Sequence, residues 1–276
     1  MSVDLWSGLF AALLTIPVAV SVGLAARDGF RGWRWWGLAA FLLGWALALL
    51  AVLSRLDQLG EDGSLLAHVA QHVILSDLAA PLLLIGLAPQ VRRPLERGYA
   101  RLVSSGHPRS TGLVWVLSPV GALILWAAMT YFWLIPPVHR LAIPDGAVHF
   151  LDHLSFLVFG LLVWLGAFDF RKGRRVRDWE ALKAGLVSCD LAWWARHVYA
   201  MVCRLAMLPA VAAIWLAGSS AYFLAGQMPP GGRTRQEEQV QAASMMLGFE
   251  MLLFCLAVVL ALIFVAVADG RARDQA

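Results

Sequence analysis

Seven stretches of roughly 20 apolar residues each constrain what this chain can fold into. A helix that crosses the roughly 30 Å hydrocarbon core of a bilayer needs about 20 residues, because each residue adds about 1.5 Å. We therefore predict an all-α polytopic membrane helix bundle with about seven transmembrane helices, forming a single integral membrane domain over residues 1–276. The predicted spans are roughly residues 5–25, 35–53, 65–88, 113–136, 148–168, 197–217 and 240–268.

Arg204 and Pro209 interrupt the sixth span, which leaves open whether it is one kinked helix or two pieces. The first span has no basic leader and no small-residue cleavage site, so we expect it to remain in the membrane. Only 14% of the residues are charged and 60% are hydrophobic, whereas a soluble domain has about 25% charged residues. The widely spaced Cys189, Cys203 and Cys255 indicate no disulfide framework.

The basic residues are divided unequally between the two ends of the predicted spans. Seventeen of the 22 lysines and arginines lie in the first, third and fifth links and in the C-terminal tail, and four lie in the other links. Cytoplasmic links carry such an excess, so we expect the N-terminus outside and the C-terminus in the cytoplasm. Orientation and contact with the lipid bilayer account for the net charge of +4, and no nucleic-acid partner is expected.

Four histidines form two pairs, each at the start of a predicted span. His68 and His72 open the third span, and His149 and His153 open the fifth. A spacing of four residues puts both imidazoles of a pair on one helix face, which Asp152 shares in the second pair. Both spans start from the outer side, so the two pairs lie at similar depth. Histidines are scarce in membrane spans and usually functional there, which favours a bound metal or haem over hydrogen bonding between helices or placement at the lipid interface.

Met246 in the seventh span is expected at about the same depth as the histidine pairs. Imidazole with a thioether suits copper, above all Cu(I), whereas imidazole with a carboxylate suits zinc or Cu(II). Packing in an apolar helix is the simpler explanation for a methionine, and ligation is the alternative. Asp152 is expected either to bind the metal or to orient a histidine. No role is assigned to His107, His139 or His197.

A second group of polar residues lies deeper in the predicted spans. Asp77, Arg204 and Glu250 are the ionisable residues furthest from the span ends. An unpaired charge inside the membrane is costly, so such groups pair with one another. We predict an ion pair between Arg204 and Asp77, with Glu250 as a second or alternative partner. Helix pairing is favoured over a proton or ion route.

Two longer segments carry the histidine pairs, namely HVAQHVILSDLAAPLLLIGLAP at residues 68–89 and HFLDHLSFLVFGLLVW at residues 149–164. In sequence they resemble the polytopic CtaG-type family of cytochrome c oxidase assembly proteins. The run EEQVQAASMM at residues 237–246 is similar to a degraded form of the family's acid–Gln motif, and it matches Glu238 and Gln239 to that motif. We therefore place these two side chains beside the metal ligands.

The resemblance implies a membrane factor of the bacterial cytoplasmic membrane that assembles a haem–copper oxidase. Its partners would be oxidase subunits in the membrane, and the cofactor it handles would be copper, loaded from the outer side. The four histidines of the two pairs match the family's histidine motifs. The copper ligands expected from the sequence are therefore His68, His72, His149 and His153, together with Met246.

The chain departs from the family pattern at three positions. Leu134, within YFWLIPP at residues 131–137, stands where the family often has a histidine. Asp152 stands where glutamate is commoner, and Glu238 where aspartate is usual. The first departure leaves a fifth histidine ligand open, which His139 in an outer loop could supply.

Two other classes of function are compatible with the same residues. The order His149-x-x-Asp152-His153 is similar to that of zinc proteases, so an intramembrane zinc hydrolase is one alternative. A haem electron carrier with His72 and His153 as axial ligands is the other. A copper permease would need ligands across the whole bilayer, and the sequence offers few below the histidines. The leading hypothesis is a copper-handling assembly factor that catalyses no reaction.

Overall fold

A computed structural model describes residues 5–104, 108–168, 193–218 and 221–273. These residues form helices joined by short links and contain no strand. The helices are α1 (Leu5–Arg27), α2 (Trp35–Leu53), α3 (Arg55–Glu61), α4 (Leu65–Val73), the π-helix η1 (Ile74–Ala79), α5 (Ala80–Gly86), α6 (Pro89–Ser104), α7 (Pro108–Val116), α8 (Pro119–Trp133), α9 (Pro136–Ala142), α10 (Gly146–Ala167), α12 (Trp193–Ala206), α13 (Leu208–Leu216), the 3₁₀-helix η2 (Pro230–Gly232) and α14 (Arg235–Arg273).

Within the described residues, six helices are long and apolar enough to cross a membrane, and a seventh span is possible if α8 and α9 are taken together. The all-helical polytopic fold expected from the sequence is therefore confirmed. The predicted fourth span, at residues 113–136, is divided among α7, α8 and α9, and α8 and α9 meet at a bend of 78°. The sixth span is one helical path from Trp194 to Leu216, because Pro209 occupies the first turn of α13, where its missing N–H costs nothing.

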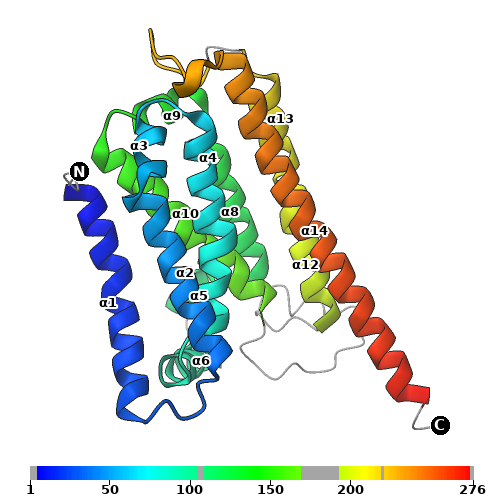
Figure 1. The fold of residues 1–276 in the computed structure, drawn as a ribbon. Helices are drawn as coiled ribbons and strands as arrows, with labels where there is room; N and C mark the ends of the chain where they lie inside the picture. Colours follow the sequence, from blue (N-terminus) through cyan, green and yellow to red (C-terminus); the bar gives the residue numbers. More distant parts are fainter. Residues whose placement is uncertain (1–4, 105–107, 169–192, 219–220, 274–276) are drawn as a thin grey trace.

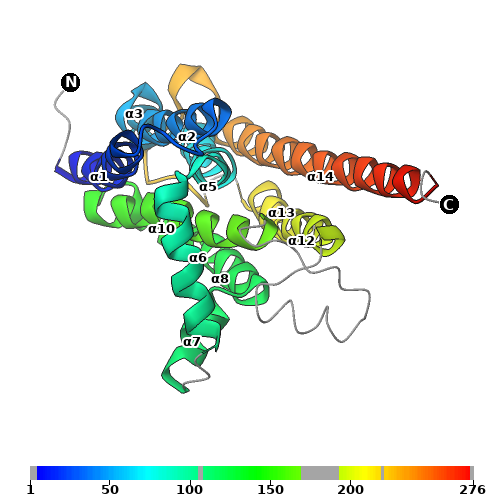
Figure 2. The ribbon, with the colours of Figure 1, turned by 90° about the horizontal axis from the view of Figure 1, so that it is seen from below.

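Different short helices lie at the two ends of the bundle. The start of α1, α3, α9 and the link before α14 gather at one end, and α6 lies at the other end, toward which the C-terminal part of α14 extends (Figure 1). Viewed along the bundle, α6 and α7 run across it rather than along it (Figure 2). Helix α6 carries four arginines in 16 residues, as suits an amphipathic helix that lies at a membrane surface. These arginines are Arg92, Arg93, Arg97 and Arg101.

The third span contains a π-helix at its middle, from Ile74 to Ala79. Pro81 explains it, because proline has no N–H and its ring clashes with the carbonyl four residues earlier, that of Asp77. A wider turn relieves this clash, and Ala80 donates its N–H to the carbonyl of Leu75, five residues back. The neighbouring helix α10 satisfies a further carbonyl, since Nε1 of Trp164 donates to the carbonyl oxygen of Ser76 at 2.9 Å.

A glycine lets α10 approach the π-helix closely. A Cβ atom at Gly160 would lie 2.8 Å from the Cα atom of Ser76, closer than side chains allow. Small residues at such crossings are typical of membrane helices, whose association depends on close packing rather than on the hydrophobic effect. The contact brings α10 against the helix that carries the first histidine pair.

The guanidinium of Arg204 lies in the interior of the bundle and binds two carboxylates. Its Nη1 atom is 2.5 Å from Oδ1 of Asp77 in η1 and 3.1 Å from Oε2 of Glu250 in α14. The rings of Trp126 in α8 and Trp164 in α10 lie 4.8 and 5.3 Å from the guanidinium carbon, within cation–π range. Arg204 itself comes from α12, so side chains of five helices meet at one charge. The two carboxylates are the partners predicted for Arg204 from the sequence, whereas the two indole rings were not predicted.

Replacing Arg204 by methionine is expected to destabilise the bundle. The change keeps much of the side-chain volume but leaves two buried carboxylates without their cation, which costs about 3–5 kcal/mol. The measurement is unfolding of the purified protein in detergent, with Arg97→Met in exposed α6 as the control.

Combining Arg204→Met with Asp77→Asn and Glu250→Gln removes the unpaired charges and should restore part of the lost stability. The interpretation would be contradicted if Arg204→Met unfolded like the wild type, or if the triple variant were no more stable than the single one.

Candidate metal centre

The two histidine pairs lie against each other at the end of the bundle that carries α3 and α9. Ser64 caps the N-terminus of α4 by accepting a hydrogen bond from the N–H of Ala67, and Asp145 caps α10 by accepting from the N–H groups of Ala147 and Val148. These caps start both helices just before their histidines. The four imidazoles, of His68, His72, His149 and His153, are all buried.

The imidazoles form a single cluster rather than two separate pairs. Ring centroids within a pair are 4.4 Å apart for His68 and His72, and 4.2 Å apart for His149 and His153. Across the two helices, the His153 ring lies 5.4 Å from the rings of both His68 and His72. The cluster is therefore compact enough for histidines of both helices to reach a common ion.

Asp152 stands between the imidazoles of α4. Its Oδ2 atom is 3.1 Å from Nε2 of His68 and 3.1 Å from Nε2 of His72. One ligand atom from each of His68, His72, Asp152 and His153 lies within 4.8 Å of the other three. Ligand bonds of about 2.0–2.2 Å hold the ligand atoms of a tetrahedral site about 3.3–3.6 Å apart, so a bound metal would draw these four atoms closer together. We call these four residues the inner ligand group.

Several buried atoms of the inner ligand group have no hydrogen-bond partner among the described residues. They are Nδ1 of His68, Oδ1 of Asp152 and Nε2 of His153. A buried polar atom without a partner is costly and needs an explanation. A bound cation would satisfy acceptor atoms of this kind, so the donor set fits a metal ion.

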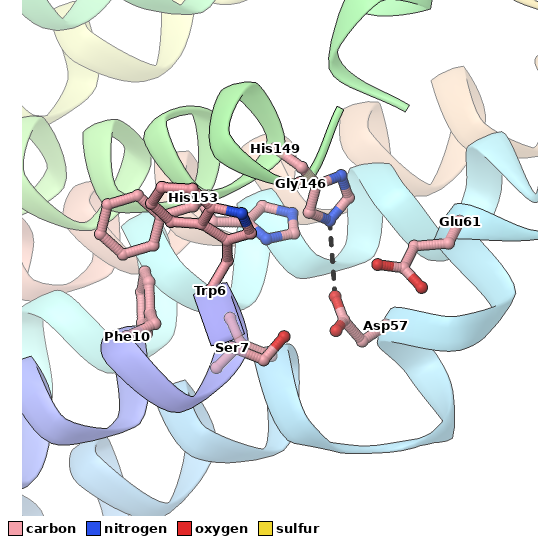
Figure 3. A pocket seen from close by; sticks show the side chains of 10 residues that line it. Trp6, Ser7, Phe10, Asp57, Glu61, Gly146, His149 and His153 are labelled. Atoms are coloured by element: carbon pink, nitrogen blue, oxygen red, sulfur yellow. Dashed lines mark ion pairs between the residues drawn. The ribbon is translucent and has the colours of Figure 1, made fainter. Parts of the chain in front are cut away.

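A second set of potential ligands adjoins the first. Asp57 in α3, His149 and His153 also bring one ligand atom each within 4.8 Å of one another. Oδ1 of Asp57 is 3.5 Å from Nε2 of His149 (Figure 3). We call these three residues the outer ligand group. Sequence reasoning missed Asp57, whose signal was an acid in the short link that precedes the helix of the first histidine pair.

His139 also belongs to the surroundings of the cluster, and its expected position in an outer loop is wrong. It lies in α9 and is buried, with its ring 4.9 Å from that of His68 and 5.5 Å from that of Tyr222. His139 is buried because the chain bends after α8, whose C-terminal cap is Leu134. The carbonyl of Leu134 accepts a hydrogen bond from the Tyr222 hydroxyl at 3.0 Å, which holds the bend in place. The chain therefore turns back over the cluster.

Met246 is buried in α14. It lines a pocket together with His72, Asp77 and Glu250, so this pocket reaches from the histidine cluster to the two carboxylates that bind Arg204. The Met246 side chain and one member of the inner ligand group, His72, therefore line the same pocket, and ligation by the Met246 sulfur stays a prediction.

Glu238 and Gln239 hold helix ends and make no hydrogen bond to a histidine of the cluster, in contrast to the sequence expectation. Oε1 of Glu238 accepts from the Ser64 hydroxyl at 2.5 Å and from the N–H of Leu66 at 3.1 Å. A carboxylate at a helix N-terminus is favourable, because it meets unpaired N–H groups and the positive end of the helix dipole. Nε2 of Gln239 donates to the carbonyls of residues 214 and 217 at the end of α13, at 2.7 Å each. Both side chains therefore fix the helices around the cluster rather than its rings.

Several residues named from the sequence lie outside the described residues. They are His107, Cys189 and the cationic residues between 171 and 183, which were counted for the membrane orientation. The arginines of α6 lie within them, at the end of the bundle opposite the histidine cluster (Figure 1).

Comparison with protein families gives one informative result. The family model described as "Cytochrome c oxidase caa3 assembly factor (Caa3_CtaG)" matches residues 18–268, which include both histidine pairs, Asp57 and the Arg204 layer. Searches of curated proteins and of solved structures gave no match. Because the matched region covers most of the 276 residues, the chain belongs to the family of cytochrome c oxidase caa3 assembly factors.

Proposed function

We propose that this protein binds copper in its histidine cluster and passes it to a haem–copper oxidase during assembly, without catalysing a reaction. The observation that carries the proposal is the inner ligand group, in which three imidazoles and one carboxylate lie within 4.8 Å of one another inside a membrane bundle. The family supplies the context, since its members are oxidase assembly factors. Buried histidines in a membrane span are expensive and point to a function.

The chemistry of the inner ligand group suits copper. Imidazole nitrogen binds copper well in both oxidation states, and the additional carboxylate of Asp152 favours a divalent ion. Asp152 also supplies a negative charge next to His68 and His72, which offsets the charge of a bound cation in a medium of low dielectric constant. Its contacts at 3.1 Å to both imidazoles orient these rings before any ion arrives.

The position of the cluster supports delivery from the outer face. The arginines of α6 lie at the opposite end of the bundle, and an excess of positive charge marks the cytoplasmic side. With α6 in the cytoplasm of a bacterial cell, the histidine cluster lies near the outer boundary of the cytoplasmic membrane. Copper would then reach an oxidase subunit by contact between the two proteins within the bilayer.

The two alternative functions fit the geometry less well. A haem would need a flat slot between His72 and His153, but the His72 ring stacks on Phe156 with centroids 3.7 Å apart, and other imidazoles fill its surroundings. A hydrolase would need Asp152 to act on a bound water. Its Oδ2 atom instead contacts both histidines of α4, as suits a group that orients ligands.

Removing two ligands of the inner group should abolish tight copper binding. The wild type is expected to bind Cu(II), with imidazole nitrogens detectable by electron paramagnetic resonance, and His72→Ala/His153→Ala should weaken binding by more than about tenfold. His197→Gln, on α12 outside the cluster, is the matched control. Metal analysis of the purified protein after equilibrium dialysis gives the stoichiometry. A double variant that binds copper as the wild type does would contradict the assignment.

The same double variant should fail in cells. In a strain that lacks the chromosomal gene, the wild-type protein should restore the copper content and activity of the oxidase, whereas His72→Ala/His153→Ala should not. Arg97→Met, at the opposite end of the bundle, should restore both. Membrane levels of each variant are measured by immunoblot, so that loss of function is separated from loss of protein. Normal oxidase copper in cells with the double variant would refute the proposed function.

A further inference from the structure

A narrow pocket lies beside the histidine cluster, between α1, α3 and the start of α10. Figure 3 shows Asp57 and Glu61 reaching toward His149 from the α3 side, with Trp6 and Ser7 of α1 on the other wall. Glu61 is exposed, so the pocket reaches the surface of the bundle. Of the two histidine pairs, only the pair of α10 lines this pocket.

Asp57 is held in a fixed position at this pocket. Nε2 of Gln71 donates to Oδ1 of Asp57 and to the carbonyl of Ala51, both at 2.7 Å. The α3 backbone packs closely on Gln71, because a Cβ atom at Gly60 would lie 2.7 Å from its Oε1 atom. Gln71 therefore orients the carboxylate toward His149, which is the kind of support that metal ligands have in proteins.

The imidazoles at the pocket have free coordination capacity. Nδ1 of His149 and Nε2 of His153 are buried and have no hydrogen-bond partner among the described residues. The His153 side chain is only 2% exposed. An acid, two imidazoles and an open approach thus meet at one place, and the imidazole atoms lack partners that a cation would provide.

We propose that the outer ligand group, Asp57 with His149 and His153, is a loading site from which copper moves to the inner ligand group. This inference rests on the proposed copper function. His153 belongs to both groups, so an ion can exchange the ligands Asp57 and His149 for His68 and His72 while its bond to His153 persists. The step is a ligand exchange at constant oxidation state, and it needs no oxidant or reductant.

The order of the two sites follows from their access. An ion that comes through the pocket meets Glu61, Asp57 and His149 first, and negative charge at a pocket mouth raises the local concentration of cations and their rate of association. His68 and Asp152 are each 1% exposed and do not line this pocket. The inner ligand group therefore receives the ion through His153.

The test follows the binding of one equivalent of Cu(II) to the protein in lipid nanodiscs by rapid freeze-quench electron paramagnetic resonance. In the wild type, an early signal with fewer nitrogen ligands should convert into a late signal with more. Asp57→Asn keeps an oxygen that can accept from Gln71. The Asp57→Asn variant should lose the early signal and bind Cu(II) about tenfold or more slowly than the wild type. Its final copper stoichiometry and its late signal should be unchanged. Asp62→Asn, an exposed acid next to α3, controls for the loss of one charge.

A second variant tests the direction of transfer. His68→Ala/His72→Ala removes two inner ligands and should form the early signal without converting it. The loading site would be overturned if Asp57→Asn loaded at the wild-type rate, or if Asp62→Asn slowed loading as much as Asp57→Asn. A wild type that bound no Cu(II) would instead overturn the proposed function itself, so the two failures are distinguishable.

Discussion

The rest of the bundle depends on one buried cation, the guanidinium of Arg204. The hydrocarbon core of a bilayer contains no water that could solvate a charge, so each charged group inside the membrane must have a partner within the protein. Arg204 meets this requirement with two carboxylates and two indole rings from four other helices. Two of those partners, Asp77 and Trp164, belong to the helices that carry the histidine pairs. The contacts that satisfy the charge therefore also fix how α4 and α10 lie beside each other.

The two buried polar clusters, one around Arg204 and one around the histidines, differ in the charges that they bring together. Around Arg204, one guanidinium faces two carboxylates at short distances. In the histidine cluster, the carboxylate of Asp152 is shared between two imidazoles, and the Nε2 atom of His153 has no partner among the described residues. Buried ion pairs hold membrane helices together, whereas buried acceptor atoms without a partner offer a place for a cation. The ion pairs of Arg204 therefore fix the helices that carry the histidine cluster.

Much of this arrangement could be predicted from sequence, because hydrophobic length and helical periodicity act locally. They predicted the membrane spans and the common helix face of each histidine pair. They also predicted that Arg204 lies at a depth similar to that of the acids with which it pairs. Asp57 and His139 could not be assigned in this way, since their positions depend on how short helices fold back over the cluster. The role of Glu238 was also hidden, because its partners, Ser64 and Leu66, are distant in sequence.

The π-helix from Ile74 to Ala79 has a consequence for the rotational phase of the third span. Five residues separate His72 from Asp77, and in a regular α-helix at about 100° per residue they would point about 140° apart. A π turn closes with the fifth residue instead of the fourth, which brings the two side chains back toward one side. His72 and Asp77 accordingly line the same pocket. One additional residue per turn thus lets a single helix direct a histidine pair and, below it, an acid into the same interior.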